Sequence, residues 1–376
     1  MSTIKTITAA ELHQQLEKGE HLFILDVRNE EDFNDWKIEG KNVQFLNIPY
    51  YNFLEEDESI YIDIPSDKEV IVVCAKGGAS EFIVETLESR NFKASHLEGG
   101  MLSWSQFYYP VVVKDEDVKV IQLNRPAKGC LSYMVISEGK ALVVDPARHV
   151  DEYVKIAAAE GVTIEHIVDS HLHADHLTGG PELAKQTGAN YYIHSSEAPN
   201  VEYIALDQTN SIQVGNTNVK VVPVETPGHT PGSVSFQIGD KYIMTGDTVF
   251  VGGLGRPDLG GKAAEWAQTL YDTVFQTISQ MPDNILVLPS HYAAQDEINE
   301  QGVVAEKLGV IRNNNEIMRN GDRKSFTDAV AASANTVKPP NFEEIVSLNR
   351  GGKPVDPDKA TELEIGPNRC AVHHGA

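Results

Sequence analysis

One short segment, residues 170–180, carries a dense set of metal-binding side chains and constrains the fold of this chain. It reads Ser-His-Leu-His-Ala-Asp-His-Leu-Thr-Gly-Gly, with His171, His173, Asp175 and His176 in close succession. The residues just before it, 163–169, are rich in β-branched side chains and predict a buried strand of an α/β protein. Ligand sites lie at the carboxyl ends of such strands, because the turns vary while the sheet holds them in place. The segment therefore predicts a metal site at a strand end.

Three further candidate ligands also follow apolar runs. His229 lies in a turn that contains two prolines, Asp247 ends the run 242–247, and His291 follows the run 285–290. A lone histidine is usually an ordinary core or surface residue. Seven such side chains in this order, each near the end of a predicted strand, instead indicate one shared metal centre.

The order of these seven side chains resembles the full ligand set of the metallo-β-lactamase superfamily. The resemblance implies an α/β fold, the αββα sandwich, in a domain over residues 115–376 that has a C-terminal extension from about residue 300. Most members bind two zinc ions and use a bridging hydroxide, because zinc lowers the pKa of its bound water to about 7. A two-zinc centre would make this chain a thioesterase, a lactonase or a β-lactamase.

A smaller branch of that superfamily, the persulfide dioxygenases, binds a single iron ion. Two histidines and one carboxylate hold the iron and leave three positions for substrate and dioxygen. By resemblance, the iron ligands are His171, His229 and Asp247. The other four side chains would orient these ligands or, in the two-zinc alternative, hold the second metal: His173, Asp175, His176 and His291.

The segment 246–258 also resembles the dioxygenases, in which an arginine-x-aspartate pair follows the metal aspartate after a glycine-rich turn. Arg256 is expected to bind a substrate carboxylate, and Asp258 to fix that arginine through a bidentate ion pair. The alternative is that the pair only staples a loop. Leu254 stands where dioxygenases of the branch often have a cysteine, so no role of that cysteine is transferred to this chain.

The N-terminal part of the chain resembles the α/β rhodanese domain, which we expect over residues 1–110. The resemblance is carried by the segments 22–28, 40–49 and 97–104. Cys74 follows the apolar run 69–73 and precedes a glycine-rich loop and a predicted helix. Backbone N–H groups and the helix dipole stabilise a thiolate there, which is the nucleophilic form of cysteine.

Cys74 is therefore expected to carry sulfur as a persulfide, and the residues that follow it are expected to contact the transferred group: Lys76, Gly77 and Gly78. Many active rhodaneses have arginines where this chain has Ala75 and Ala79, so Lys76 alone supplies positive charge in the loop. A buried, inert cysteine is the alternative.

Together the two halves predict a persulfide dioxygenase with one Fe(II) per chain. It would oxidise a low-molecular-weight thiol persulfide, of the glutathione type, with O₂ to sulfite and the parent thiol. Sulfur transfer through Cys74 would form or use thiosulfate, in sulfide metabolism or detoxification. Two alternatives stay open: a dinuclear zinc hydrolase, and a non-catalytic sulfur relay or sensor.

The composition excludes some partners. The chain has 31 Lys and Arg against 55 Asp and Glu, a net charge of -24 that opposes nucleic acids and anionic membranes. With no apparent signal peptide or membrane-spanning run, we expect a cytoplasmic protein, and the extension is compatible with a homodimer. Three cysteines imply no disulfide framework. Cys130 is expected to fill core space, and the tail around Cys370 to be a disordered surface.

Overall fold

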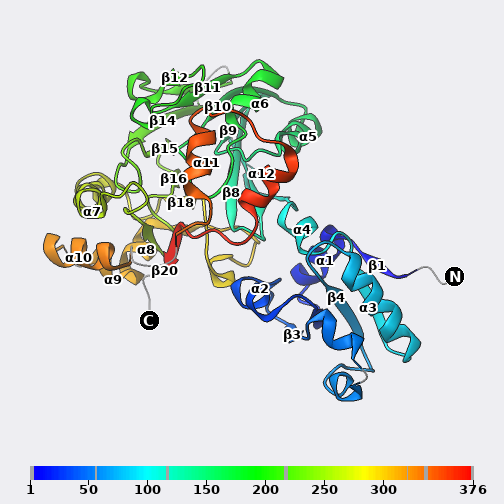
Figure 1. Ribbon diagram of the computed structural model, residues 1–376. Coiled ribbons are helices and arrows are strands. Elements are labelled where there is room, and N and C mark those ends of the chain that lie inside the picture. Colours follow the sequence, from blue (N-terminus) through cyan, green and yellow to red (C-terminus); the bar gives the residue numbers. More distant parts are fainter. Residues whose placement is uncertain are drawn as a thin grey trace. The chain divides into compact units, whose positions relative to one another are not determined.

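The computed structural model describes residues 4–55, 57–115, 118–215, 219–319, 321–333 and 338–373. These residues form two compact units (Figure 1). The first unit consists of residues 1–108 with 125–128 and 365–367, and the second of 109–124, 129–364 and 368–376. Each unit has its own apolar core.

The first unit is a parallel sheet with helices on both faces. Its strand order is β1-β5-β4-β2-β3, and every pairing is parallel. The strands are β1 (Thr6–Ile7), β2 (Leu22–Asp26), β3 (Val43–Asn47), β4 (Glu69–Val73) and β5 (Lys93–Leu97). The helices are α1 (Ala9–Glu17), α2 (Glu30–Asp35), α3 (Gly78–Ser89) and α4 (Gly100–Ser105), with short 3₁₀ turns at Tyr50–Leu54 and Glu58–Tyr61.

Strand β4 shows why the run 69–73 is almost continuously apolar. Val70 and Val72 pack with Ile83 and Leu87 of α3, in the core on one face of the sheet. Ile71 and Val73 point to the other face, where the core contains residues of α1 and α4. A strand covered on both faces needs apolar side chains at every position, and this strand ends at Cys74.

The second unit contains two large sheets. The first has the order β12-β11-β10-β9-β8-β7-β6, and the second has the order β13-β14-β15-β16-β18-β19. The strands of the first sheet are β6 (Tyr109–Asp115), β7 (Lys119–Arg125), β8 (Cys130–Ser137), β9 (Lys140–Val144), β10 (Thr163–Val168), β11 (Asn190–Ile193) and β12 (Ile204–Ala205). Those of the second are β13 (Ile212–Val214), β14 (Val219–Glu225), β15 (Val234–Ile238), β16 (Tyr242–Gly246), β18 (Leu286–Pro289) and β19 (Glu306–Lys307).

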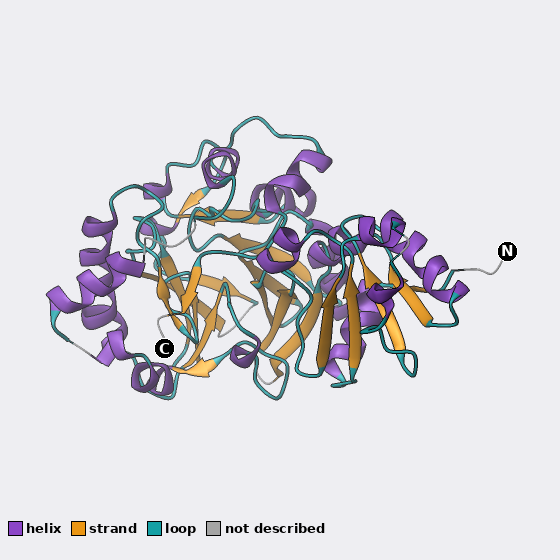
Figure 2. Cartoon of the chain, turned by 60° about the horizontal axis from the view of Figure 1, so that its bottom comes forward, coloured by secondary structure: helices purple, strands orange, loops and turns teal. Residues whose placement is uncertain are grey.

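These two sheets pack face to face between helices. One core cluster contains Val135 and Leu142 of the first sheet with Phe236 and Met244 of the second. The outer face of the second sheet is covered by α7 (Ala263–Asp272) and by helices of the extension, while α5 (Val150–Glu160) and α6 (Gly180–Thr187) pack against the first sheet. Helices lie outside the strands in this unit (Figure 2). The predicted αββα fold class is confirmed.

The C-terminal extension supplies further helices and a small sheet. The helices are α8 (Leu308–Asn314), α9 (Glu316–Arg319), α10 (Arg323–Ser333), α11 (Phe342–Asn349) and α12 (Pro357–Glu364). The small sheet pairs β17 (Gly253–Gly255) with β20 (Ala371–His373) in antiparallel register. The expectation that the tail is a disordered surface is therefore wrong, because Cys370 is fully buried and β20 follows it. Residues 374–376 of that tail lie outside the described residues.

Within the described part of the chain, none of the helices combines the length and apolar character needed to cross a bilayer.

Candidate metal centre

All seven predicted ligand side chains are buried in the second unit. The segment that follows β10 carries four of them, and the turn between β14 and β15 carries His229. Asp247 directly follows β16, and His291 lies just beyond β18. None of the seven is more than 3% exposed. The structure divides them into three neighbouring groups.

The first group consists of His171, His229 and Asp247. The Nε2 atoms of both histidines lie 3.6 Å from Oδ2 of Asp247. These three atoms are buried and find no hydrogen-bond partner among the described residues. A buried polar atom without a partner costs about 1–3 kcal/mol, so native structures rarely leave three together. The group therefore fits a metal ion, which would satisfy all three atoms.

Hydrogen bonds behind the two histidines fix which nitrogen faces the group. Nδ1 of His229 donates to the backbone carbonyl of Arg256 at 2.8 Å. The Ser170 hydroxyl donates to Asp145 at 2.8 Å, so it accepts from Nδ1 of His171 at 2.9 Å. Both rings thus carry their proton on Nδ1 and present the lone pair of Nε2, which is the form that binds metals.

Burial and the neighbouring imidazoles of His173 and His229 hold the pKa of His171 well below its usual range. A neutral ring is the state required of a metal ligand. The lowered pKa of His171 therefore agrees with its hydrogen bonding, because both indicate a neutral ring with a free lone pair on Nε2.

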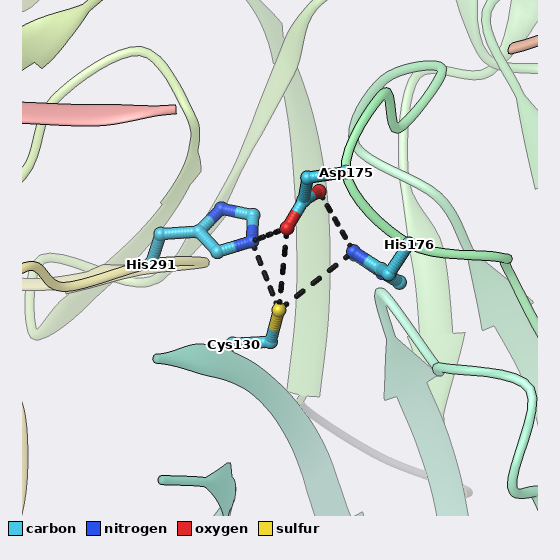
Figure 3. Close-up of side chains that lie close together, drawn as sticks. All are labelled: Cys130, Asp175, His176 and His291. Carbon is cyan, nitrogen blue, oxygen red and sulfur yellow. Dashed lines mark hydrogen bonds and ion pairs between the residues drawn. The ribbon is translucent and has the colours of Figure 1, made fainter. Parts of the chain in front are cut away.

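The second group consists of Asp175, His176, His291 and one residue that the motif did not include, Cys130 (Figure 3). Asp175 accepts from Nδ1 of His176 at 2.9 Å, and its other oxygen lies 3.0 Å from Nε2 of His291. Nδ1 of His291 donates to Oδ1 of Asp247 at 2.6 Å, which connects the two groups. The polar atoms of the second group are thus partnered, in contrast to those of the first.

The second group is a network of opposite charges. Burial lowers the pKa of His176, but the charges of Asp175 and Cys130 outweigh it and raise this pKa to about 10. Burial also opposes the charged form of His291, yet Asp175 and Asp247 raise its pKa well above the usual range. Burial and Asp175 would raise the pKa of the Cys130 thiol, but His291 and His176 lower it overall.

His173 belongs to a third buried group, with Asp145 and Asp169. Its Nε2 lies 3.4 Å from Oδ1 of Asp145. Burial raises the pKa of Asp169 to about 6, while His173 opposes that shift. Since Asp145 also accepts from the backbone and hydroxyl of Ser170, this third group supports the loop that carries His171.

Arg256 lies in the protein interior with a side chain that is 0% exposed. Its Nε and Nη2 donate to the two oxygens of Asp258 at 2.7 and 2.9 Å, and its Nη1 donates to the carbonyl of Arg369 at 2.9 Å. This geometry favours a structural role for the ion pair over a substrate contact. It also connects the loop that follows Asp247 to the segment preceding β20. Substrate binding by Arg256 and Asp258 remains a prediction.

In the first unit, Cys74 lies at the N-terminal end of α3 as predicted from the sequence. Its sulfur accepts from the backbone N–H of Gly77 at 3.1 Å, and the thiol donates to Ser80 Oγ at 3.2 Å. Gly77 has φ +100°, which favours glycine at this turn. Lys76 and Gly78 are exposed at the loop surface. Their contact with a transferred sulfur stays a prediction.

Sequence reasoning missed two contributors to the centre. Cys130 was expected to be core filler, because it opens an apolar strand with no other ligand nearby in sequence. Asn349, at the end of α11, donates to the carbonyls of His173 and His176 at 2.9 Å. No local pattern marks either residue, because their partners lie far away along the chain.

Comparison with known proteins assigns both units. Residues 8–107 match the rhodanese-like domain, and residues 125–291 match the metallo-beta-lactamase superfamily. The chain joins a rhodanese-like domain to a metallo-beta-lactamase domain. The metallo-beta-lactamase fold implies a metal, iron or zinc, and the first group provides a suitable site for one.

The relatives of the metallo-beta-lactamase domain include enzymes of two reaction classes. Hydroxyacylglutathione hydrolase of Anaeromyxobacter dehalogenans is 33% identical over 180 residues, which are 46% of this chain and 66% of that protein. The mitochondrial persulfide dioxygenase ETHE1 of Bos taurus is 30% identical over 155 residues, 40% of this chain and 59% of that protein. The chain thus spans less than two thirds of either relative.

A solved structure, ETHE1 from Myxococcus xanthus, superimposes with a TM-score of 0.54 at 26% identity. The match covers 61% of this chain and 96% of that structure. These similarities establish a metallo-beta-lactamase domain and leave its reaction to be argued from the site.

Proposed function

We propose that the protein is an iron-dependent persulfide dioxygenase whose rhodanese-like domain transfers sulfur through Cys74. One contrast carries the proposal. The buried ligand atoms of His171, His229 and Asp247 are unpartnered within the described residues, whereas His176 and His291, which could hold a second metal, both bond to Asp175. That contrast supports one metal per chain, and two histidines with one carboxylate are typical of non-heme Fe(II) oxygenases.

A bound Fe(II) would supply adjacent open positions for dioxygen and the terminal sulfur of a persulfide. Other residues of the chain hold the three metal-binding side chains in one orientation. Ser170 and the Arg256 carbonyl fix the two imidazoles, and His291 holds the carboxylate of Asp247 from behind. We propose a low-molecular-weight thiol persulfide of the glutathione type as the substrate, which reacts with O₂ and one water molecule to give sulfite and the free thiol.

The rhodanese-like domain would connect this reaction to sulfur transfer. The thiolate of Cys74 would attack the outer sulfur of a donor persulfide and release the donor thiolate. Sulfite would then take that sulfur from the Cys74 persulfide, forming the S–S bond of thiosulfate as the bond to Cys74 breaks. Such chemistry requires reduced thiols, which supports a cytoplasmic location.

The hydrolase alternative is favoured by one observation. The residues that hold a second zinc in that class of enzyme are present as Asp175, His176 and His291, and a hydroxyacylglutathione hydrolase is among the relatives. A zinc pair with a bridging hydroxide would then cleave a thioester.

Metal content and oxygen uptake together test the proposal. The full chain, purified without oxygen and loaded with Fe(II), should bind about one iron and consume O₂ with glutathione persulfide while sulfite accumulates. The variants His229→Ala and Asp247→Ala should reduce uptake to the background rate, because each removes one of the three ligands. Two zinc ions per chain, with thioester cleavage and no oxygen uptake, would show that the protein is a hydrolase.

A further inference from the structure

A buried histidine lies beside the Cys74 loop in the first unit. His96 is the fourth residue of β5 and pairs with Val72 of β4, the strand that precedes Cys74. Ala94, two residues earlier in β5, belongs to the core that α3 covers, so His96 lies on the same face of the sheet as that helix. His96 is only 7% exposed. A buried ionisable side chain of this kind requires a polar partner.

That partner is Ser80, which connects His96 to the sulfur of Cys74. The Ser80 hydroxyl accepts from the Cys74 thiol at 3.2 Å and lies 3.5 Å from Nδ1 of His96. The second contact is long, as contacts between reacting groups often are before substrate binds. Ser80 donates its own proton to the Gly77 carbonyl at 2.8 Å, but a hydroxyl can rotate toward the sulfur or the imidazole. The three side chains therefore form a buried route for a proton.

The charged side chains on neighbouring elements are paired or turned toward solvent. Glu69 of β4 pairs with Lys5, which precedes β1, at the surface. At the end of β2, Arg28 and Asp26 form a bidentate ion pair with each other. The acidic side chains of α3 are exposed or half-buried: Glu81, Glu85 and Glu88. None of these groups, among the described residues, is hydrogen-bonded to the serine or the histidine.

The loop itself offers a thiolate little positive charge. Lys76 is the only cation among residues 74–80, and it is exposed. Water and salt screen an exposed charge, so Lys76 stabilises a buried anion only weakly. Cys74 is 5% exposed, and the N–H of Gly77 is one donor to its sulfur. An imidazolium on the other side of Ser80 would supply the missing positive charge inside the unit.

We propose that His96 takes the proton of the Cys74 thiol through Ser80 and thereby makes Cys74 a nucleophile. The inference rests on the proposed sulfur transfer and names the group that activates it. The S–H bond of Cys74 breaks, the Ser80 hydroxyl gains that proton, and the hydroxyl passes its own proton to Nδ1 of His96. The thiolate is then held by the N–H of Gly77 and the O–H of Ser80. His96 acts through Ser80, so it is a positioning residue and not a catalytic one.

The proton stays on His96 during one cycle of sulfur transfer. The Cys74 thiolate attacks the outer sulfur of a donor persulfide, the S–S bond of the donor breaks, and the donor leaves as a thiolate. Sulfite then bonds to the transferred sulfur as the bond from that sulfur to Cys74 breaks. Cys74 leaves as a thiolate and takes the proton back from His96. Each step exchanges one S–S bond for another, so no oxidant or reductant is needed.

The pH dependence of Cys74 alkylation tests this role in the full chain. Iodoacetamide reacts with the thiolate, and mass spectrometry of the digested protein identifies the labelled cysteine. His96→Gln and Ser80→Ala should slow the alkylation of Cys74 at neutral pH about 10-fold, because less of the thiol is ionised. At strongly alkaline pH, where every thiol is ionised, both variants should react at least as fast as wild type. A loss of access to Cys74 would instead slow the reaction at every pH.

Two variants are matched controls for this experiment. His13→Gln removes another buried imidazole of the same unit, one that pairs with Glu17. Ser95→Ala removes the hydroxyl next to His96 in β5, which donates to Glu69. Both controls should keep the wild-type profile. A His96→Gln profile that superimposes on that of wild type would overturn the proposal.

A second measurement decides the question even if neither test variant folds. The ring nitrogens of His96 are observed by NMR in wild type and in Cys74→Ser at the same neutral pH. Wild type should contain the larger fraction of imidazolium, because serine at position 74 provides no anion to stabilise it. Equal fractions in the two proteins would overturn the proposal.

These outcomes are separable from the proposed reaction. Slower alkylation of His96→Gln, in a protein whose wild type transfers no sulfur to sulfite, would contradict the sulfur transfer while leaving the activation of Cys74 intact. A wild type that forms thiosulfate, with an unchanged alkylation profile in His96→Gln, would do the reverse.

Discussion

At the scale of single residues, the supporting hydrogen bonds set the chemistry of the ligands. The Ser170 hydroxyl donates to Asp145 and accepts from Nδ1 of His171, so these three side chains form a hydrogen-bond chain. Asp145 has φ +51°, a backbone conformation that non-glycine residues rarely adopt. Strained residues persist where several contacts hold them, and Asp145 accepts from Ser170 and Ser290. The hydrogen bonds of Asp145 to Ser170 and Ser290 thus hold its backbone in a conformation that places its carboxylate behind His171.

Replacing Ser170 with alanine should weaken iron binding about 10- to 100-fold, as is typical when the residue behind a metal-bound histidine is removed. The ring of His171 loses the acceptor of its Nδ1 proton, although all three ligands remain. Competition with a chelator measures the Fe(II) dissociation constant. Ser195→Ala is the matched control, since that hydroxyl also donates to an aspartate but lies at the surface. Equal affinity of Ser170→Ala and wild type would contradict this role.

The ligand residues were predictable from the sequence, but their division into groups was not. The cluster 171–176 and the aspartate after β16 identified the side chains, because each follows an apolar run. Which of these side chains share a metal depends on distances of a few ångströms between loops of different sheets. Cys130 joins the second group only because its backbone pairs with that of His291. A strand-initial cysteine has no local pattern that reveals such a partner.

At the scale of elements, the helices of the extension hold the loop that carries the histidine cluster. The Asn349 amide at the end of α11 donates to two carbonyls of that loop and accepts from Thr178 N at 3.0 Å. Glu364 at the end of α12 accepts from Leu177 N at 2.7 Å and pairs with Arg148. The sequence predicted an extension with helices, but not its contacts with a loop more than 170 residues earlier.

Replacing Asn349 with alanine should destabilise the protein by about 1–3 kcal/mol, because it leaves buried backbone groups of the loop without partners. Chemical denaturation of the metal-free protein measures the effect, and the Fe(II) affinity should fall with it. Asn313→Ala, at an exposed position of α8, is the control and should change little. An unchanged midpoint for Asn349→Ala would show that α11 does not support the loop.

At the scale of the whole molecule, the chain carries two separate sets of reactive groups. Cys74 belongs to the first unit and follows a strand of its sheet, whereas the metal centre belongs to the second unit and uses residues of both large sheets there. The sequence predicted both domains because each has its own apolar strands and motif. The direction in which sulfur passes between them depends on chemistry that no residue pattern specifies.

Cys74→Ser should therefore separate the two activities. Oxygen uptake with a persulfide should continue near the wild-type rate, while transfer of sulfur to sulfite should fall to background, because serine cannot carry sulfane sulfur. An oxygen electrode and a thiosulfate assay on the same protein measure both activities. His229→Ala is the reciprocal control, expected to lose oxygen uptake and retain sulfur transfer. Loss of oxygen uptake in Cys74→Ser would contradict independent sites and favour a relay.

The backbone bridge between Cys130 and His291 joins residues 161 positions apart in the sequence. The first sheet brings His171 and Cys130, and the second brings His229, Asp247 and His291, so neither half of the sandwich can hold the ion alone. A metal ion would then bind only after the two halves have docked during folding. A bound ion would stabilise only the completed sandwich, so it would be released when the two halves separate on unfolding.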